Sequence, residues 1–89
     1  MPETGDSRPQ GLVDAEMLDR MANDLGIPCD IAIVDGTSYR VELDYGRAKG
    51  LELNPWDAMK SALDALKTRG TKYGQQAEQL EKMLTGARL

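Results

Sequence analysis

Histidine and phenylalanine are absent from this 89-residue sequence, and cysteine occurs only once. Without histidine, the chain lacks the side chain that most often serves as a general base and the most common ligand of transition metals. The single cysteine, Cys29, excludes an internal disulfide and is typical of a reducing compartment. Cys29 follows a proline, opens an apolar strand pattern and has no basic neighbour, so we expect a buried, unreactive thiol. These absences predict a protein that is not an enzyme and that uses no cofactor or metal.

Long apolar runs are missing as well. No stretch approaches the roughly 18 residues of a membrane-spanning helix, and the first six residues are polar and acidic, unlike a secretory signal. We therefore expect a cytoplasmic protein with no membrane partner. Residues 1–12 combine proline, glycine and scattered charge, which predicts a flexible tail before a single small domain at residues 13–89.

The first helix is predicted at residues 15–25, with Asp14 as its N-cap. Apolar side chains recur there at helical spacing, which indicates one face turned to a core. Gly26 followed closely by Pro28 is a strong stop signal, because glycine adopts the left-handed cap conformation and proline cannot continue the helix. The expected apolar face consists of Met17, Leu18, Met21, Ala22 and Leu25.

A β-hairpin is predicted next, from alternating runs at residues 29–34 and 38–45 on either side of an Asp-Gly pair. A two-residue loop would place apolar and charged side chains on the same face. A three-residue loop at residues 34–36 pairs Ile31 with Tyr39 and keeps one face wholly apolar, so we favour that register.

The second run of the hairpin ends at Tyr45, which the alternation places on the apolar face together with Tyr39. We expect both rings in the core rather than on a platform for stacking bases. A third short strand at residues 50–53, after a turn at residues 46–47, is an open alternative. It is attractive because an isolated hairpin is marginally stable in water.

Two C-terminal helices complete the predicted fold. Asn54 is a good N-cap, Pro55 suits the first helical position, and Asp57 places a carboxylate in the first turn, so a helix is expected from there to Gly70. The last helix is predicted at residues 73–85, capped by the next glycine. The element order α-β-β-(β)-α-α indicates an α+β protein with one N-terminal helix, an antiparallel hairpin or three-stranded meander, and two further helices.

Charge is distributed unevenly along the chain, whose formal net charge is −4. Residues 1–45 carry ten acidic and three basic side chains, whereas residues 46–89 carry five acidic and eight basic ones. The hairpin carboxylates match no metal-binding loop and are expected on a solvated strand face; they are Asp30, Asp35, Glu42 and Asp44. Trp56 is either the edge of the core or an exposed anchor, and its alignment with Met59 and Leu63 favours the core.

These features predict a small non-catalytic protein-binding module, such as a regulator, inhibitor or accessory subunit of bacterial or phage type. The acidic half could contact a basic site of the target, or the hairpin edge could pair with a strand of the target. The candidate partner surface is Asp30, Arg40, Glu42, Asp44, Arg47, Lys49 and Trp56. The apolar helix stripes and the hairpin edge favour a homodimer over a monomer.

A nucleic-acid-binding domain is the alternative function. Its phosphate contacts would come from the basic residues between the hairpin and the last helix. These residues are Arg47, Lys49, Lys60, Lys67, Arg69 and Lys72.

Overall fold

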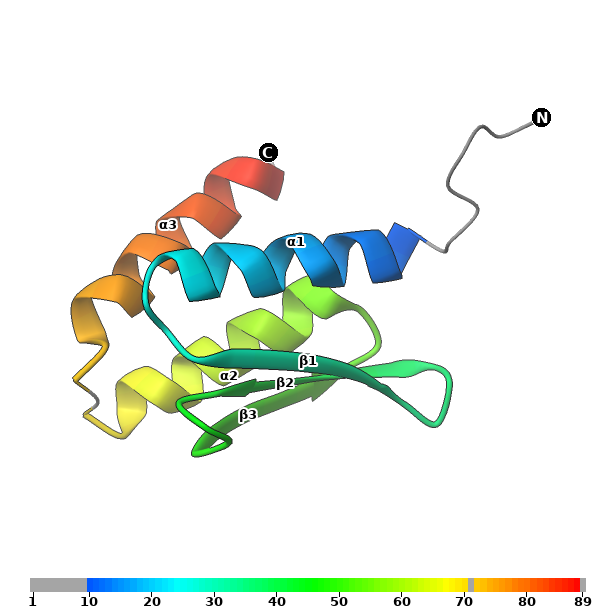
Figure 1. Ribbon diagram of the computed structural model, residues 1–89, viewed down its shortest axis with the longest axis horizontal. Helices are drawn as coiled ribbons and strands as arrows, with labels where there is room; N and C mark the ends of the chain where they lie inside the picture. Colours follow the sequence, from blue (N-terminus) through cyan, green and yellow to red (C-terminus); the bar gives the residue numbers. More distant parts are fainter. Residues whose placement is uncertain (1–9, 71, 89) are drawn as a thin grey trace.

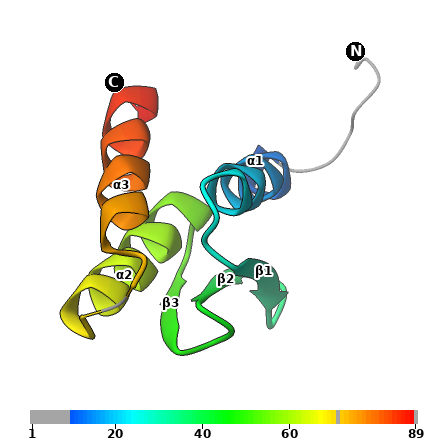
Figure 2. The same cartoon turned by 60° about the vertical axis from the view of Figure 1, so that its left-hand side comes forward.

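Two helices cover one face of a three-stranded antiparallel sheet, and a third helix packs beside them (Figures 1 and 2). The computed structural model describes residues 10–70 and 72–88. The sheet has the order β1-β2-β3. The α+β prediction is confirmed, and the third strand is formed. The elements are α1 (Gln10–Asp24), β1 (Cys29–Val34), β2 (Ser38–Leu43), β3 (Ala48–Glu52), α2 (Pro55–Thr68) and α3 (Gly74–Arg88).

The core lies between the sheet and its two covering helices. Helix α2 contacts both β3 and β2, helix α1 contacts β1 and α2, and helix α3 reaches the core through α2. Burial of aliphatic side chains supplies the main driving force for this packing. The largest fully buried side chains are Leu18, Ile27, Val41, Leu43, Met59, Leu63, Leu66 and Leu80.

The start of α2 follows the prediction closely. The Oδ1 atom of Asn54 accepts a hydrogen bond from the backbone N–H of Asp57 at 2.8 Å. The Nδ2 atom of Asn54 donates in return to Asp57 Oδ2 at 2.8 Å, and Pro55 occupies the first turn. Such a cap stabilises a helix by about 1 kcal/mol. Local sequence therefore fixes where α2 begins.

A close contact between backbones holds α2 against β3. Gly50 lies under the helix, where a Cβ atom would collide with the carbonyl oxygen of Ala58 and lie 2.7 Å from the backbone nitrogen of Ala62. The same atom would lie 2.9 Å from the Cβ of Ser61. Only glycine fits here, because the atoms that it faces are mainly backbone and cannot move aside.

The register of the hairpin differs from the prediction by two residues. Ile31 pairs with Val41, not with Tyr39, and the loop is 35–37. The apolar face is unchanged, because a shift of two residues keeps every side chain on its side. Val34 remains in the strand because Asp35 adopts the left-handed conformation (φ 55°) together with Gly36 (φ 74°). Aspartate tolerates that conformation better than a β-branched valine would.

Helix α1 begins at Gln10, five residues before the predicted start. Asp14 is therefore not an N-cap; its carboxylate lies inside the helix and accepts hydrogen bonds from Gln10 Nε2 (2.9 Å) and Trp56 Nε1 (3.0 Å). Gly11 packs against the Tyr39 hydroxyl, where a larger residue would clash. Residues 10–12, expected in a flexible tail, belong to α1, and the remainder of the expected tail, residues 1–9, lies outside the described residues.

Two further predictions about helices are wrong. Met17 was expected on the buried face of α1, but it is 40% exposed, because the helix turns Ala15, Leu18 and Ala22 to the core instead. Helix α3 does not end at Gly86 but continues to Arg88. A single glycine lowers helix propensity by about 1 kcal/mol, which is too little to end a helix that tertiary packing supports.

Replacement of Gly50 by alanine should destabilise the protein strongly. The added methyl group has no space between β3 and α2, and overpacking of this kind costs about 3 kcal/mol. Urea unfolding followed by circular dichroism measures the effect. Gly86→Ala is the matched control, since a Cβ there meets open space within α3 and should stabilise the helix slightly. Equal midpoints for the two variants would contradict the close contact.

Candidate functional site

The sheet has one face without a covering helix among residues 10–70 and 72–88 (Figure 2). Side chains on this open face form cross-strand rows. Asp30 pairs with Glu42, which pairs with Lys49 on the other side. A second row consists of Ala32, Arg40 and Leu51. The sheet thus brings together four members of the predicted partner surface, Asp30, Arg40, Glu42 and Lys49.

Charges on the open face are only partly balanced. Arg40 Nε lies 3.2 Å from Glu42 Oε2, but it makes no hydrogen bond within the described part of the chain, so the contact is electrostatic. Glu42 also faces Lys49 across the strands, whereas Asp30 on the edge strand faces only the Glu42 carboxylate. Like charges directly opposite each other are unfavourable. The Asp30 edge of this face is therefore suited to receive a cation.

The turn between β2 and β3 places three successive residues in the left-handed region. Their φ values are 55° for Asp44, 58° for Tyr45 and 86° for Gly46. The backbone N–H of Arg47 closes the turn on the Asp44 carbonyl at 3.1 Å, and Arg47 Nη1 lies 3.5 Å from Asp44 Oδ1. These two members of the predicted surface therefore flank the open face instead of lying on a strand.

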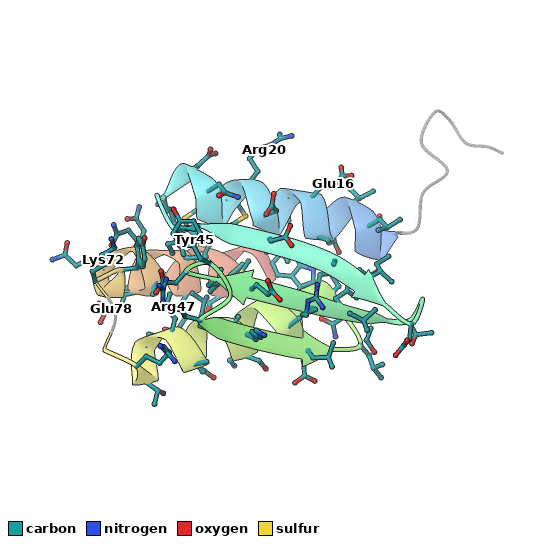
Figure 3. The ribbon with its side chains drawn as sticks, turned by 60° about the horizontal axis from the view of Figure 1, so that its bottom comes forward. Glu16, Arg20, Tyr45, Arg47, Lys72 and Glu78 are labelled. Carbon is teal, nitrogen blue, oxygen red and sulfur yellow. The ribbon has the colours of Figure 1, made fainter. Side chains whose placement is uncertain are left out.

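Tyr45 was expected in the core, and this prediction is wrong. Strand β2 ends at Leu43, so the strand alternation does not reach Tyr45, whose side chain is 80% exposed (Figure 3). The left-handed conformation is costly for an aromatic residue, and such strain is concentrated at binding and catalytic sites. The exposed ring of Tyr45, on a strained backbone beside the open face, is a candidate recognition group. The two-residue alternation of a strand could not predict its position.

Trp56 lies apart from the other members of the predicted surface. It stands in the first turn of α2, on the covered side of the sheet, half-buried against the core. Its indole Nε1 donates to Asp14 on α1. Trp56 therefore connects two helices, and the structure does not bring it to the open face.

Cys29 is half-buried at the start of β1. Burial raises the pKa of its thiol well above the usual range, and the nearby Asp19 carboxylate raises it further by its charge and by accepting a hydrogen bond from the thiol. A protonated thiol is a poor nucleophile. This environment agrees with the expected low reactivity.

The predicted basic residues are dispersed over several surfaces. Arg47, Arg69 and Lys72 surround one open hollow of about 430 Å³ at the end of the molecule where the β2–β3 turn lies. Lys67 instead pairs with Glu81 at 2.7 Å, between α2 and α3. Lys49 lies on the open face. Three cations are thus gathered, and the others point elsewhere.

Residues 10–70 and 72–88 contain neither a metal-binding cluster nor a membrane-spanning helix. No three carboxylate or thiol groups gather closely enough to hold a metal ion. No helix in these ranges has both the length and the apolar character needed to cross a lipid bilayer.

Tyr45→Asn should stabilise the protein by about 1 kcal/mol, because asparagine adopts the left-handed conformation at lower cost and the exposed ring buries little area. Tyr45→Ala is the control, since it removes the ring but retains the backbone strain. Urea unfolding midpoints measure both. If the two variants have the same stability, the strain does not lie at this residue.

The Cys29 thiol should react with a disulfide reagent at pH 8 at least ten times more slowly in the folded protein than in urea. Asp19→Asn should accelerate the reaction, because it removes a negative charge beside the thiol. The acceleration should be partial, since burial is the larger cause of the raised pKa. Absorbance of the released thiolate follows the reaction. A folded-state rate equal to the rate in urea would refute the protected environment.

Comparisons with known proteins add no identification. No family model, curated protein or solved structure matches this chain.

Proposed function

We propose that this chain is a non-catalytic protein-binding module, a regulator, inhibitor or accessory subunit of the cytoplasm, which recognises its partner through the open face of the sheet. The observation that supports this proposal most directly is the face itself. It combines charged side chains with apolar ones, and Leu51 is 56% exposed there. Leu53, directly after β3, is 75% exposed, and Tyr45 is exposed at the β2–β3 turn, at the other end of β3. Exposed apolar side chains on a charged face, such as Leu51 and Leu53, are typical of a docking site.

The size of the open face limits how a partner can bind. Three strands of five or six residues span roughly 15 Å by 20 Å, or about 300 Å². A stable protein–protein interface covers about 800 Å² on each partner. A partner that uses this face must therefore continue over the β2–β3 turn or past an edge of the sheet.

The chemistry of the described side chains supports binding over catalysis. The Cys29 thiol is held protonated. The carboxylates of Asp30, Glu42 and Asp44 lie at the surface in reach of water and not in an enclosed cavity. These residues are better suited to electrostatic recognition.

Nucleic-acid binding is the second candidate, favoured by the hollow that Arg47, Arg69 and Lys72 surround. Phosphate binding strengthens with each cation that contacts the backbone. Three gathered cations are few, and Asp44 lies among them. The open face also presents carboxylates that repel phosphate. We therefore rank this function below protein binding.

The test is affinity capture from a lysate of the source cells with an open-face variant that carries Lys49→Glu and Leu51→Lys. The matched control is Lys82→Glu with Met83→Lys, which makes the same type of change on exposed residues of α3. Quantitative mass spectrometry should recover a partner at least tenfold more with wild type and control than with the open-face variant.

Two outcomes of the capture experiment would reject the proposed surface. Equal recovery by all three proteins, or no partner in low salt, contradicts recognition by the open face. Recovery that disappears after nuclease treatment supports the nucleic-acid function instead.

A further inference from the structure

Among the described residues, the outer edge of β1 is open from Ile31 to Val34, whereas at its start Asn23 Nδ2 donates to the Cys29 carbonyl at 3.5 Å. β1 is an edge strand of the sheet. Between Cys29 and Val34 it contains no proline and no lysine, and Asp30 is its only charged residue. Edge strands usually carry such residues, bulges or covering elements, because unpaired backbone groups recruit another strand. The uncharged run from Ile31 to Val34 is therefore able to accept a further strand.

The opposite edge, β3, is less open to such pairing. Helix α2 lies directly over Gly50, and Glu52 accepts a hydrogen bond from Ser61 Oγ on α2 at 3.2 Å. β3 also carries two charged side chains in five residues, Lys49 and Glu52. Of the two edges, β1 is the better candidate for binding an extended chain.

A groove between α1 and β1 adjoins this edge. Its volume is about 200 Å³, enough for small aliphatic side chains. Its apolar lining consists of Leu12, Ala15, Ile31, Ala32, Ile33 and Tyr39, and its acidic groups are Glu16, Asp19 and Asp30. Figure 3 shows Glu16 on the outward side of α1, followed one turn later by Arg20. With Arg20 included, the charge along this groove is still negative.

The geometry of a sheet determines what an added strand would contact. Successive side chains of a strand point to opposite faces. On the helix side, alternate side chains of the added strand would lie beside Ile31 and Ile33 and enter the apolar groove. On the other side, they would lie beside Asp30 and Ala32, on the open face. An extended segment with two different sets of side chains fits this edge.

A second hollow at the Asp30 end indicates the chemistry of one of these side chains. It has a volume of about 440 Å³, and Asp30, Glu42 and Tyr45 contribute to its lining. Because Glu42 already faces Arg40 and Lys49, the Asp30 carboxylate and the exposed aromatic ring together favour a lysine or arginine side chain, which can pair with Asp30 and rest on the ring. A basic side chain there would offset the unfavourable pairing of Asp30 with Glu42. It would also contact the exposed ring of Tyr45, whose backbone is strained.

The same charges argue against a second copy of this chain as the occupant. Antiparallel pairing of β1 with its own copy would bring the two α1 helices side by side at the two-fold axis. Glu16 and Asp19 lie in the middle of α1, so the acidic groups of both copies would face one another. Like charges at short range repel, and the repulsion is strongest where water is excluded.

We propose that the outer edge of β1 binds an extended segment of the partner protein as a fourth strand, with apolar side chains in the α1–β1 groove and a lysine or arginine beside Asp30. This proposal rests on the proposed protein-binding function, and it extends the open face past the edge of the sheet, as the size of that face requires.

The test uses the full chain and fluorescein-labelled nine-residue peptides that alternate valine with arginine, followed by fluorescence anisotropy. Three control peptides separate the contributions. Glutamate in place of arginine reverses the charge, a block arrangement of the same residues removes the alternation, and N-methylation of alternate backbone nitrogens removes strand pairing. The alternating peptide should bind at least tenfold tighter than each control. Equal binding of the block or N-methylated peptide, or no binding at all, overturns the proposal.

Variants of the protein locate the contact. Asp30→Lys should weaken binding of the alternating peptide at least tenfold. Asp64→Lys makes the same change of charge at an exposed position on α2 and should alter affinity less than twofold. In ¹⁵N–¹H spectra, the amide signals of residues 29–34 should move more than those of residues 48–52. Equal effects of the two variants, or unmoved β1 signals, exclude this edge.

Failure of strand binding at β1 and failure of the proposed protein-binding function give different results. If no peptide binds β1 but the lysate partner still depends on Lys49 and Leu51, then the module recognises its partner by the open face alone. If the partner is also lost from the capture experiment, the protein-binding function itself fails.

Discussion

The arrangement of the whole molecule depends on the contact between α2 and β3 at Gly50. The helix backbone rests on the strand because no side chain separates them, and the small residues Ala58 and Ala62 continue the contact. With α2 this close to β3 and β2, the only uncovered part of that face lies over β1, and α1 occupies it. Because α1 and α2 already cover this face of the sheet, helix α3 packs on α2. All three helices therefore lie on one side of the sheet (Figure 2).

The candidate surfaces are a consequence of this one-sided packing. Because no described helix remains for the second face, the row from Asp30 through Glu42 to Lys49 faces solvent. Because α1 must contact α2 as well as β1, it leaves a groove beside the β1 edge and does not cover it. The open face and the groove thus share an origin, and they meet at Asp30, which contributes to both.

The sequence predicted those features that depend on local interactions. The cap at Asn54, the α+β element order and the alternation that gathers Asp30, Arg40, Glu42 and Lys49 on one face all follow from short-range spacing. The failures depend on partners distant in sequence. Helix α1 begins before its predicted start because Gly11 packs on Tyr39 and the Asp14 carboxylate accepts a hydrogen bond from Trp56. Nothing in the local sequence indicates either contact.

The two misjudged turns have a different cause. Both contain non-glycine residues in the left-handed region, Asp35 in one and Asp44 with Tyr45 in the other. A prediction from strand alternation assumes an extended backbone. It therefore placed the loop of the first hairpin at residues 34–36 and Tyr45 in the core, and both positions were wrong. The Asp-Gly pair at residues 35–36 did predict a turn. The register of the hairpin, however, depends on which residues adopt the left-handed conformation.

The acidic groups beside the β1 edge bear on whether two copies of this chain could pair there. A short uncharged run such as residues 31–34 would by itself promote pairing between copies. Under the proposed strand binding, Glu16, Asp19 and Asp30 would oppose pairing of two copies at this edge and attract a basic segment. Over distances of about 8 Å at physiological ionic strength, salt does not fully screen either effect. In the proposed arrangement, one set of carboxylates would therefore oppose self-association at this edge and also favour a basic partner.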